Sequence, residues 1–262
     1  MPVLKFSEAE AALEEKKFSF SPLKENTTTG GFKTYCRDQM NRGNTPKILL
    51  DDELKMPFNL SAGKNKEIQP GSNLNMELSV NESDHPKLVS YLKQFDALYA
   101  AYIQANAEQI FRRSLKPDQI SFMQIPSLNP DKKVPGRYLF RVKVNSNSVK
   151  VYVITEAKDN KITKYRQGTL ADLQPNSTQH LVISHVLGWT NNSQFGFVHS
   201  GNKILVTPPK QFVREDDDDD EFPFGSQYTE DNTNPTRDTE DTNPAKKNRV
   251  ETDDDGVLSD LE

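Results

Sequence analysis

Short stretches in which apolar and polar residues alternate recur along the first 210 positions of the chain. Leu74, Met76, Leu78 and Val80 alternate with polar residues, which is the pattern of a half-buried β-strand. Further strands are predicted at 32–37, 137–144, 149–155, 181–189, 195–199 and 203–207, with short apolar runs at 47–50 and 55–60. Turns such as Ser200-Gly201-Asn202 separate the later strands, whose spacing is typical of a meander or small barrel.

One longer stretch follows the helical period instead. Its apolar residues recur every three or four positions and form one stripe, made of Leu88, Leu92, Phe95, Tyr99, Tyr102, Ile103 and Ile110. Asp84 or His85 is suited to cap this helix and Pro86 to begin it, and the helix is predicted to reach Arg112-Arg113. Near the start of the chain, Ser7 and Glu10 have the spacing of a capping box, so residues 1–24 are expected to be a short helix or a mobile arm.

Charge divides the chain into two unlike parts. Of the 33 Lys and Arg, four follow Arg214, and of the 38 Asp and Glu, 18 do, so the first part has a net charge of +9 and the last part −14. A segment this acidic and this poor in apolar residues cannot bury enough surface to offset its ordering entropy. We therefore expect a mainly β, OB-like five-stranded barrel with one long inserted helix at residues 25–212, followed by a disordered acidic tail at 213–262.

Patterns typical of enzymes and metal sites are missing from the sequence. Ser61-Ala62-Gly63-Lys64 lacks the upstream glycine of a phosphate-binding loop, and no nucleophile elbow or Cys-x-x-Cys is found. The four histidines and the single cysteine do not have zinc-ligand spacing, and His180 and His185 are expected on opposite faces of one strand in structural roles. The sequence thus indicates no enzyme, cofactor or metal.

Nothing in the sequence predicts export or membrane insertion. A lone cysteine, Cys36, cannot form an intramolecular disulfide, and the first residues do not resemble a signal peptide. No apolar run approaches the length of a membrane span. We expect a soluble intracellular protein.

Binding of single-stranded nucleic acid requires cations for phosphates and flat side chains on which bases stack. Both kinds of residue recur on one face of predicted strands: Lys33, Tyr35 and Arg37; Arg137, Arg141 and Lys143; Lys150 and Tyr152. The alternative is an ordinary solvated basic face, with Tyr138 and Phe140 in the core. Trp189, the only tryptophan, ends a strand beside a polar loop, where it would either stack on a base or plug the end of the barrel.

The tail has candidate roles of its own. A tethered segment of charge −14 is held near a basic surface at high effective concentration, so it is expected to compete with DNA. Its acidic run with apolar anchors suits docking on basic partner proteins, and the candidate residues are Asp216, Asp217, Asp218, Asp219, Asp220, Phe222, Phe224, Leu258 and Leu261. The alternative is a plain solubility tail. Lys246, Lys247 and Arg249 resemble a short nuclear localisation signal, which would place the protein in a host nucleus or at a viral replication site.

The order of these elements resembles the replicative single-stranded DNA-binding proteins of short-tailed coliphages and their relatives in large eukaryotic DNA viruses. The resemblance covers roughly residues 30–262 and is carried by three segments: Met76–Val80 with the turn Asn81–Pro86, the helix containing Tyr99-Ala100-Ala101-Tyr102, and Val186-Leu187-Gly188-Trp189-Thr190-Asn191. It implies an OB fold, sequence-independent binding of single strands, a homodimer formed or modulated through the tail, and tail contacts with polymerase or helicase. The stacking role then falls on Trp189 and Tyr35.

In one respect the chain departs from that family. The phage tails end in an aromatic residue, whereas this chain ends in Val257-Leu258-Ser259-Asp260-Leu261-Glu262. Phe222 and Phe224 are the candidates to replace that residue in partner docking.

The predicted function is therefore sequence-independent binding of single-stranded DNA during replication, recombination or repair. Two rival functions remain open: an acidic-tailed chaperone of basic, histone-like proteins, and an RNA-binding OB protein.

Overall fold

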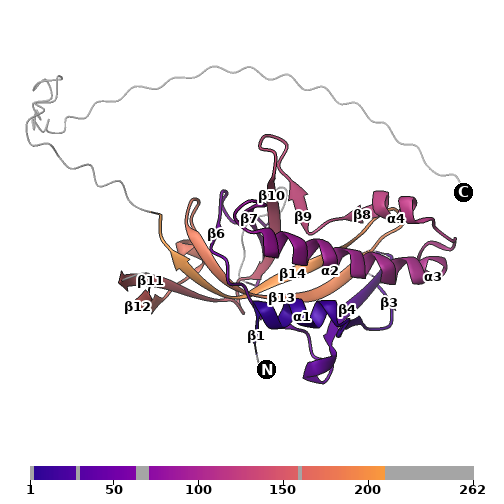
Figure 1. Cartoon of the computed structure of the whole chain (residues 1–262), viewed down its shortest axis with the longest axis horizontal. Coiled ribbons are helices and arrows are strands. Elements are labelled where there is room, and N and C mark those ends of the chain that lie inside the picture. The colour runs from indigo at the N-terminus through magenta and orange to yellow at the C-terminus, as the bar shows by residue number, and fades with distance from the viewer. Residues whose placement is uncertain (1–2, 28–29, 63–70, 159–160, 210–262) are drawn as a thin grey trace, which may run out of the picture. The chain divides into compact units, whose positions relative to one another are not determined.

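The computed structural model describes residues 3–27, 30–62, 71–158 and 161–209, which form a mainly β fold (Figure 1). The strands are β1 (Leu4–Lys5), β2 (Phe18–Phe20), β3 (Lys24–Glu25), β4 (Phe32–Asp38), β5 (Lys47–Leu49), β6 (Leu54–Lys55), β7 (Asn73–Asn81), β8 (Gln124–Ile125), β9 (Leu128–Pro130), β10 (Arg137–Asn145), β11 (Lys150–Lys158), β12 (Lys161–Gln167), β13 (Thr178–Thr190) and β14 (Phe195–Thr207). The helices are α1 (Phe6–Glu14), α2 (Pro86–Ala105), α3 (Ala107–Phe111) and α4 (Pro117–Met123), with 3-10 turns at Gln39–Asn41 and Leu170–Asp172.

Five of the strands close into a ring in the order β6, β7, β10, β14, β13 and back to β6. All neighbours in the ring are antiparallel except β10 and β14, which run parallel. The long helix α2 lies between β7 and β10 in the chain. The predicted mainly β, OB-like fold with an inserted helix is therefore confirmed.

The core fills the inner side of this ring and continues under α2. Alternate residues of β7 and β10, such as Met76, Leu78 and Val142, are fully buried, and Phe140 is buried as predicted. The apolar stripe of α2 packs on the same core through residues that include Leu92 and Phe95. Figure 1 shows α2 running alongside β13 and β14. Helix α2 packs directly against β13 at Gly188, where an added Cβ would lie 2.6 Å from Cζ of Tyr99.

Two helix boundaries differ from the prediction. The helix predicted to reach Arg112-Arg113 ends at Ala105, and the short α3 follows. The break falls at Asn106, whose side-chain amide donates to the carbonyl of Tyr102 at 2.8 Å and so competes with the helical backbone. Helix α1 is capped by the Glu8 carboxylate, which accepts from the backbone N–H of Lys5 at 2.8 Å. Ser7 lies inside this helix, so the predicted capping box was placed two residues too late.

The predicted turn at Ser200-Gly201-Asn202 is also wrong, because β14 runs unbroken from Phe195 to Thr207. The long strand β13 provides partners along its whole length. The turn-forming residues are accommodated as a β-bulge: Gly201 pairs with Ile183 and Lys203 with Val182, which leaves Asn202 as the extra residue. The strand β12 was not predicted at all.

The N-terminal residues are part of the same compact unit as the ring. Strand β1 pairs with β5, while β2 and β3 pair with β4. The buried face of α1 joins the main core through Phe6, Ala9, Ala12 and Leu13. Within the described ranges, no helix has the length and apolar character needed to cross a membrane.

Replacing Gly31 with alanine is expected to lower the free energy of unfolding by roughly 2–4 kcal/mol. Gly31 has a φ of +76°, and an added Cβ would lie 2.1 Å from the carbonyl oxygen of Thr190. Gly30 is the matched control, because its φ is +70° but no described atom lies within 4 Å of its Cβ position. Gly30→Ala should cost only about 1–2 kcal/mol. Urea denaturation of the two variants measures the difference in the free energy of unfolding. Equal losses of stability would contradict the close approach of Gly31 to the carbonyl of Thr190.

Candidate nucleic-acid interface

The face of the sheet opposite α2 gathers the aromatic and cationic residues of four strands. Directly opposed residues of neighbouring strands project to the same face. Trp189 of β13 lies opposite Lys33 of β4, which in turn lies opposite Lys24 of β3. On its other side Trp189 lies opposite Gly196 of β14. The inward-facing neighbour of Trp189 is Gly188, which contacts α2, so the indole projects away from that helix.

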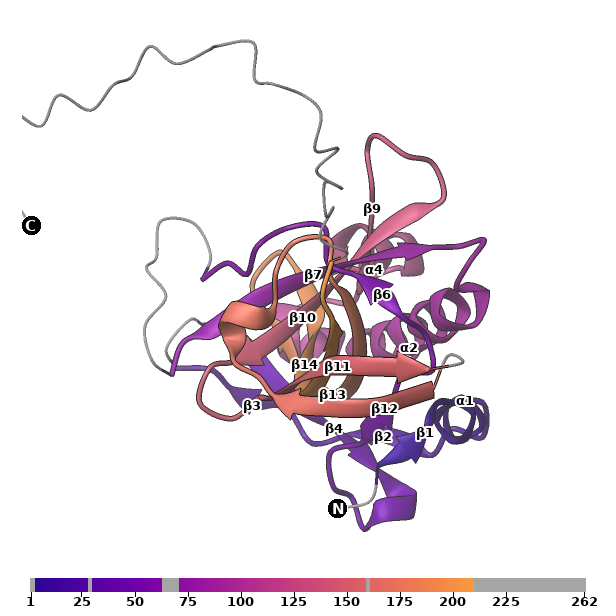
Figure 2. The ribbon, with the colours of Figure 1, turned by 90° about the vertical axis from the view of Figure 1, so that its left-hand side faces the viewer.

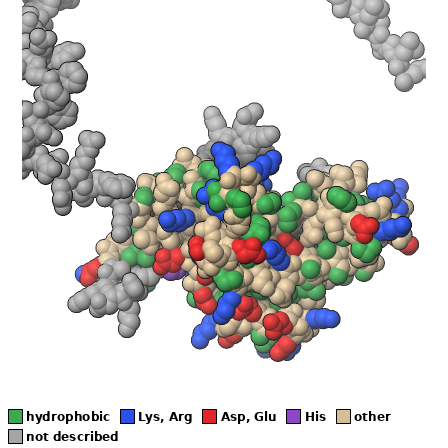
Figure 3. Space-filling model, turned by 45° about the horizontal axis from the view of Figure 1, so that its top comes forward, with side chains coloured by type: hydrophobic (Ala, Val, Ile, Leu, Met, Phe, Trp, Pro, Cys, Tyr) green, Lys and Arg blue, Asp and Glu red, His purple; other side chains and the backbone are tan. Residues whose placement is uncertain are grey.

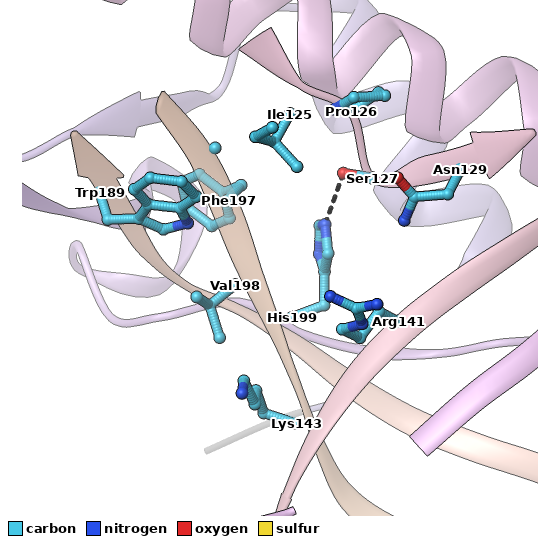
Figure 4. A pocket seen from close by; sticks show the side chains of 11 residues that line it. Ile125, Pro126, Ser127, Asn129, Arg141, Lys143, Trp189, Phe197, Val198 and His199 are labelled. Carbon is cyan, nitrogen blue, oxygen red and sulfur yellow. Dashed lines mark hydrogen bonds between the residues drawn. The ribbon is translucent and has the colours of Figure 1, made fainter. Parts of the chain in front are cut away.

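A pocket lies on this face where the neighbouring strands β10 and β14 separate. Strands β10 and β14 pair at only two positions, Val142 with His199 and Lys143 with Ser200, and then separate. The segment 124–130 occupies the gap, with β8 pairing to β14 and β9 pairing to β10. The resulting pocket has a volume of about 250 Å³ and is lined by residues that include Trp189, Arg141, Lys143, Ser127 and His199 (Figure 4).

The indole of Trp189 forms one wall of the pocket and rests on a glycine. An added Cβ at Gly196 would lie 3.0 Å from Cζ2 of Trp189 and 3.2 Å from the carbonyl oxygen of Ile125. Because glycine has no side chain, the indole ring of Trp189 packs directly against the backbone of β14 at this position. Figure 4 shows Trp189 and Ser127 on opposite sides of the pocket and Lys143 at its edge. A planar base entering the pocket would meet both an aromatic ring and a cation.

The two cations of the pocket have different electrostatic surroundings. Arg141 is paired with Glu77 across β7 and β10, its Nη2 lying 2.6 Å from Oε1 of Glu77. Lys143 forms no ion pair with any carboxylate in the described part of the chain. Partial burial, and then the charge of Arg141, lower the pKa of Lys143. An anion bound beside Lys143 would favour the charged ammonium and so oppose both effects.

The remaining predicted residues do not line this pocket. Tyr35 is opposite Leu187 on the same face as Trp189. Arg37, two residues further along β4, donates to the carbonyl of Gly43 at 3.0 Å. Arg137, at the far end of β10, is held by Asp131 through an ion pair of 2.5 Å. Lys150 and Tyr152 are on β11 and line no part of this pocket.

Charges of both signs are interspersed over the face of the molecule that Figure 3 presents, rather than forming a field of one sign. Several surface cations are paired with carboxylates, among them Lys93 with Glu82 and Arg166 with Asp172. Near Trp189, Lys33 and Lys143 form no ion pair with a described carboxylate. The tail residues Asp216–Asp220, Phe222, Phe224, Leu258 and Leu261 and the Lys246, Lys247, Arg249 cluster lie outside the described residues.

Behind the pocket, five buried or nearly buried side chains form one chain of hydrogen bonds. Ser127 Oγ donates to Asp96 Oδ1 (2.6 Å) and lies 2.7 Å from His199 Nε2. The two histidines His199 and His185 face each other through their Nδ1 atoms at 2.7 Å, and His185 Nε2 lies 2.7 Å from the hydroxyl of Tyr91. With both imidazoles neutral, every proton in the chain points the same way, from Tyr91 toward the Asp96 carboxylate.

This chain contains a serine, a histidine and an aspartate but not in the arrangement of a hydrolase triad. In a triad the carboxylate orients the histidine, which accepts the proton of the serine. Here the carboxylate accepts directly from Ser127, and the second nitrogen of His199 faces another histidine. Burial lowers the pKa of His199 to about 3, so it is a poor general base at neutral pH. No group of three His, Cys, Asp or Glu within the described ranges is placed to hold a metal ion.

Sequence reasoning missed several residues of this face. Ile125 of β8, Asn129 of β9 and the two residues between these strands, Pro126 and Ser127, line the pocket, and strands of two and three residues are too short to show a period. Lys24 joins the face through a two-residue strand for the same reason. Only strand pairing reveals these contributions.

No protein-family model matches the chain, and no curated protein does. Among solved structures, the chain is similar to a single-stranded DNA-binding protein from bacteriophage Enc34 (10% identity, TM-score 0.36, covering 77% of this chain and 98% of that one). It is likewise similar to gp2.5, a single-stranded DNA-binding protein encoded by bacteriophage T7 (12% identity, TM-score 0.39, 74% and 100%), and to the Enc34 protein in complex with ssDNA (8%, 0.36, 71% and 94%). Likenesses at these identities and TM-scores do not assign a function, which has to be argued from the residues of this chain.

Proposed function

We propose that the protein is a non-enzymatic single-stranded DNA-binding protein that coats strands exposed during replication, recombination or repair, without sequence preference. The observation that carries the proposal is the convergence of Trp189, Lys143 and Arg141 on one pocket, with Lys33 beside the indole. An aromatic platform flanked by cations is the combination that single strands require, because every base has a π-face and every nucleotide a phosphate.

Indifference to sequence follows from what surrounds the indole. Reading a base requires free donors and acceptors aimed at its edges. Ser127 and His199 line the pocket, but their polar atoms already bond to Asp96, to His185 and to each other. Asn129 also lines the pocket with its side-chain amide, and a single amide beside the stacking ring is too little to specify a sequence. Stacking on Trp189 and attraction to Lys143 act on any nucleotide alike.

The acidic tail extends this proposal. A segment of charge −14 attached to the end of β14 competes with phosphates for the same cations, and its apolar residues Phe222, Phe224, Leu258 and Leu261 dock partner enzymes such as a polymerase or helicase. A homodimer formed through the tail and nuclear targeting by Lys246, Lys247 and Arg249 belong to the same proposal.

Competition between nucleic acids tests the proposed function. A labelled 12-mer of dT bound to the full chain is displaced by unlabelled single-stranded DNA, single-stranded RNA or duplex DNA of equal length. We expect single-stranded DNA of any sequence to compete best and duplex to compete poorly. Equal or better competition by RNA would favour the RNA-binding function, and binding of histones with no DNA affinity would favour the chaperone.

Lys143→Gln should weaken binding of dT12 about three- to tenfold at low salt and reduce the slope of log K against log salt by about 0.7, the loss of one phosphate contact. Lys93→Gln is the control, because Lys93 lies on α2 in an ion pair with Glu82. Fluorescence anisotropy at three NaCl concentrations gives both slopes. An unchanged slope of log K against log salt for Lys143→Gln would show that Lys143 does not contact a phosphate of the bound strand.

A further inference from the structure

A second aromatic and cationic site lies further along β14. The hairpin of β11 and β12 carries Tyr152 and Tyr165, whose rings meet edge-to-face at a centroid distance of 5.5 Å. Tyr165 is 63% exposed, the second most exposed of the large apolar side chains in the described ranges. With Leu49, His180, Lys203 and Leu205 the two tyrosines line a pocket of about 300 Å³. Figure 2 shows this hairpin in front of the strands of the ring.

The charges at this pocket favour an anionic ligand. Lys150 lies directly opposite Lys203, and neither forms an ion pair with a carboxylate within the described part of the chain. In contrast to Lys150 and Lys203, two cations on β12 do form ion pairs: Lys164 is paired with Glu156 and Arg166 with Asp172. The one carboxylate contact at the pocket is that of Glu53, which lies 3.1 Å from His180.

The bulge in β14 puts this pocket on the same face as Trp189. Before the bulge Gly196, Val198 and Ser200 project outward; after it Lys203 and Leu205 do, while Ile204 is buried. Without the extra residue Asn202, the alternation of the strand would turn Lys203 toward the core. From Val198 to Leu205 the strand takes six steps when the bulged Asn202 is not counted, which is roughly 20 Å at about 3.3 Å per residue. Six stacked nucleotides at about 3.4 Å each cover that length.

We propose that Tyr152 and Tyr165, with Lys150 and Lys203, form a second subsite for the same single strand that binds at Trp189, so that a strand of about six or more nucleotides engages both. This inference rests on the proposed function. A strand too short to reach from one pocket to the other engages the Trp189 pocket alone.

The test is a comparison of short and long oligonucleotides on the full chain. End-labelled dT4 and dT12 are titrated, by fluorescence anisotropy, into wild type, Tyr165→Ala, Lys203→Gln and Phe58→Ala. Phe58 is the control because its ring is 53% exposed and lines neither pocket. We expect Tyr165→Ala to weaken dT12 about tenfold and leave dT4 within twofold. Lys203→Gln should reduce the salt slope for dT12 alone by about 0.7.

The outcomes separate this inference from the proposed function. If wild type binds both lengths but Tyr165→Ala and Lys203→Gln bind dT12 as wild type does, the second subsite is wrong and the function stands. Equal losses on dT4 and dT12 would also contradict a separate subsite. A wild-type chain that binds neither oligonucleotide overturns the function and the subsite together.

Discussion

Replacing Trp189 with alanine is expected to weaken binding of dT12 by 10- to 100-fold, since stacking of one base on an aromatic side chain contributes about 1–3 kcal/mol. The indole forms a wall of the pocket and rests on Gly196, so alanine removes the stacking surface while the cations beside it remain. The salt slope should therefore be nearly unchanged. A lower affinity for dT12 with an unchanged slope of log K against log salt would show that Trp189 acts by stacking and not through phosphate contacts.

Two further variants make the Trp189 result interpretable. Trp189→Phe keeps a smaller ring and should recover most of the lost affinity. Phe58→Ala removes an exposed aromatic elsewhere and should bind as wild type does. Anisotropy titrations at fixed salt compare all four proteins, and urea denaturation checks that each is folded. If Trp189→Ala binds with wild-type affinity, the pocket is not the stacking site.

Acidification is expected to destabilise the protein by roughly 3 kcal/mol between pH 6.5 and 4.5 because two histidines are buried in the core. Burial, and then the neighbouring imidazole, hold the pKa of His185 well below its usual value, and burial lowers that of His199 to about 3. In the unfolded chain both take up protons below about pH 6.5, while in the folded chain both stay neutral over this window.

The sign and size of this effect follow from counting protons. Stability rises with pH wherever the unfolded state binds more protons, and two histidines give a slope of about 2.7 kcal/mol per pH unit. Asp96 acts in the opposite direction, because burial raises its pKa to about 6 and the folded state binds its proton first. Below about pH 6 it cancels one of the two histidines, which leaves roughly 1.4 kcal/mol per unit.

Urea denaturation at pH 6.5, 5.5 and 4.5 measures this dependence. His185→Gln should lower the slope because it removes one of the two titrations. Nitrogen NMR of the histidine rings gives a test independent of any variant. A titration of His185 or His199 near pH 6.5 in the folded protein would contradict the expectation that both imidazoles stay neutral over this pH range.

The long strands were predictable from sequence and the short ones were not. In β7 strict alternation spans nine residues and is seen in the burial of the strand, and in β10 it holds from Phe140 to Asn145. Strands such as β6 and β8 have two residues each, and β12 has few apolar residues, so neither gives a periodic signal. The bulge at Asn202 was mistaken for a turn, because Ser-Gly-Asn suits both and only the pairing with β13 distinguishes them.

For the site, sequence indicated the residue types but not their partners. Trp189 was selected from one strand and Arg141 and Lys143 from another, and the three residues line one pocket. The sequence could not show that Arg141 is paired with Glu77, 64 residues away, or that Tyr152 lines a different pocket and Lys150 lies opposite Lys203. Both facts depend on strand order and register, which are set by the whole sheet rather than by any local pattern.

Titration of dT12 into the full chain, following the emission of its single tryptophan at several NaCl concentrations, tests the central claim most directly. We predict saturable quenching of Trp189 and a log K that falls linearly with log salt, with a slope of roughly −2 from contacts by Lys33, Arg141 and Lys143. A folded protein that shows neither quenching nor binding at low salt would contradict single-strand binding on this face.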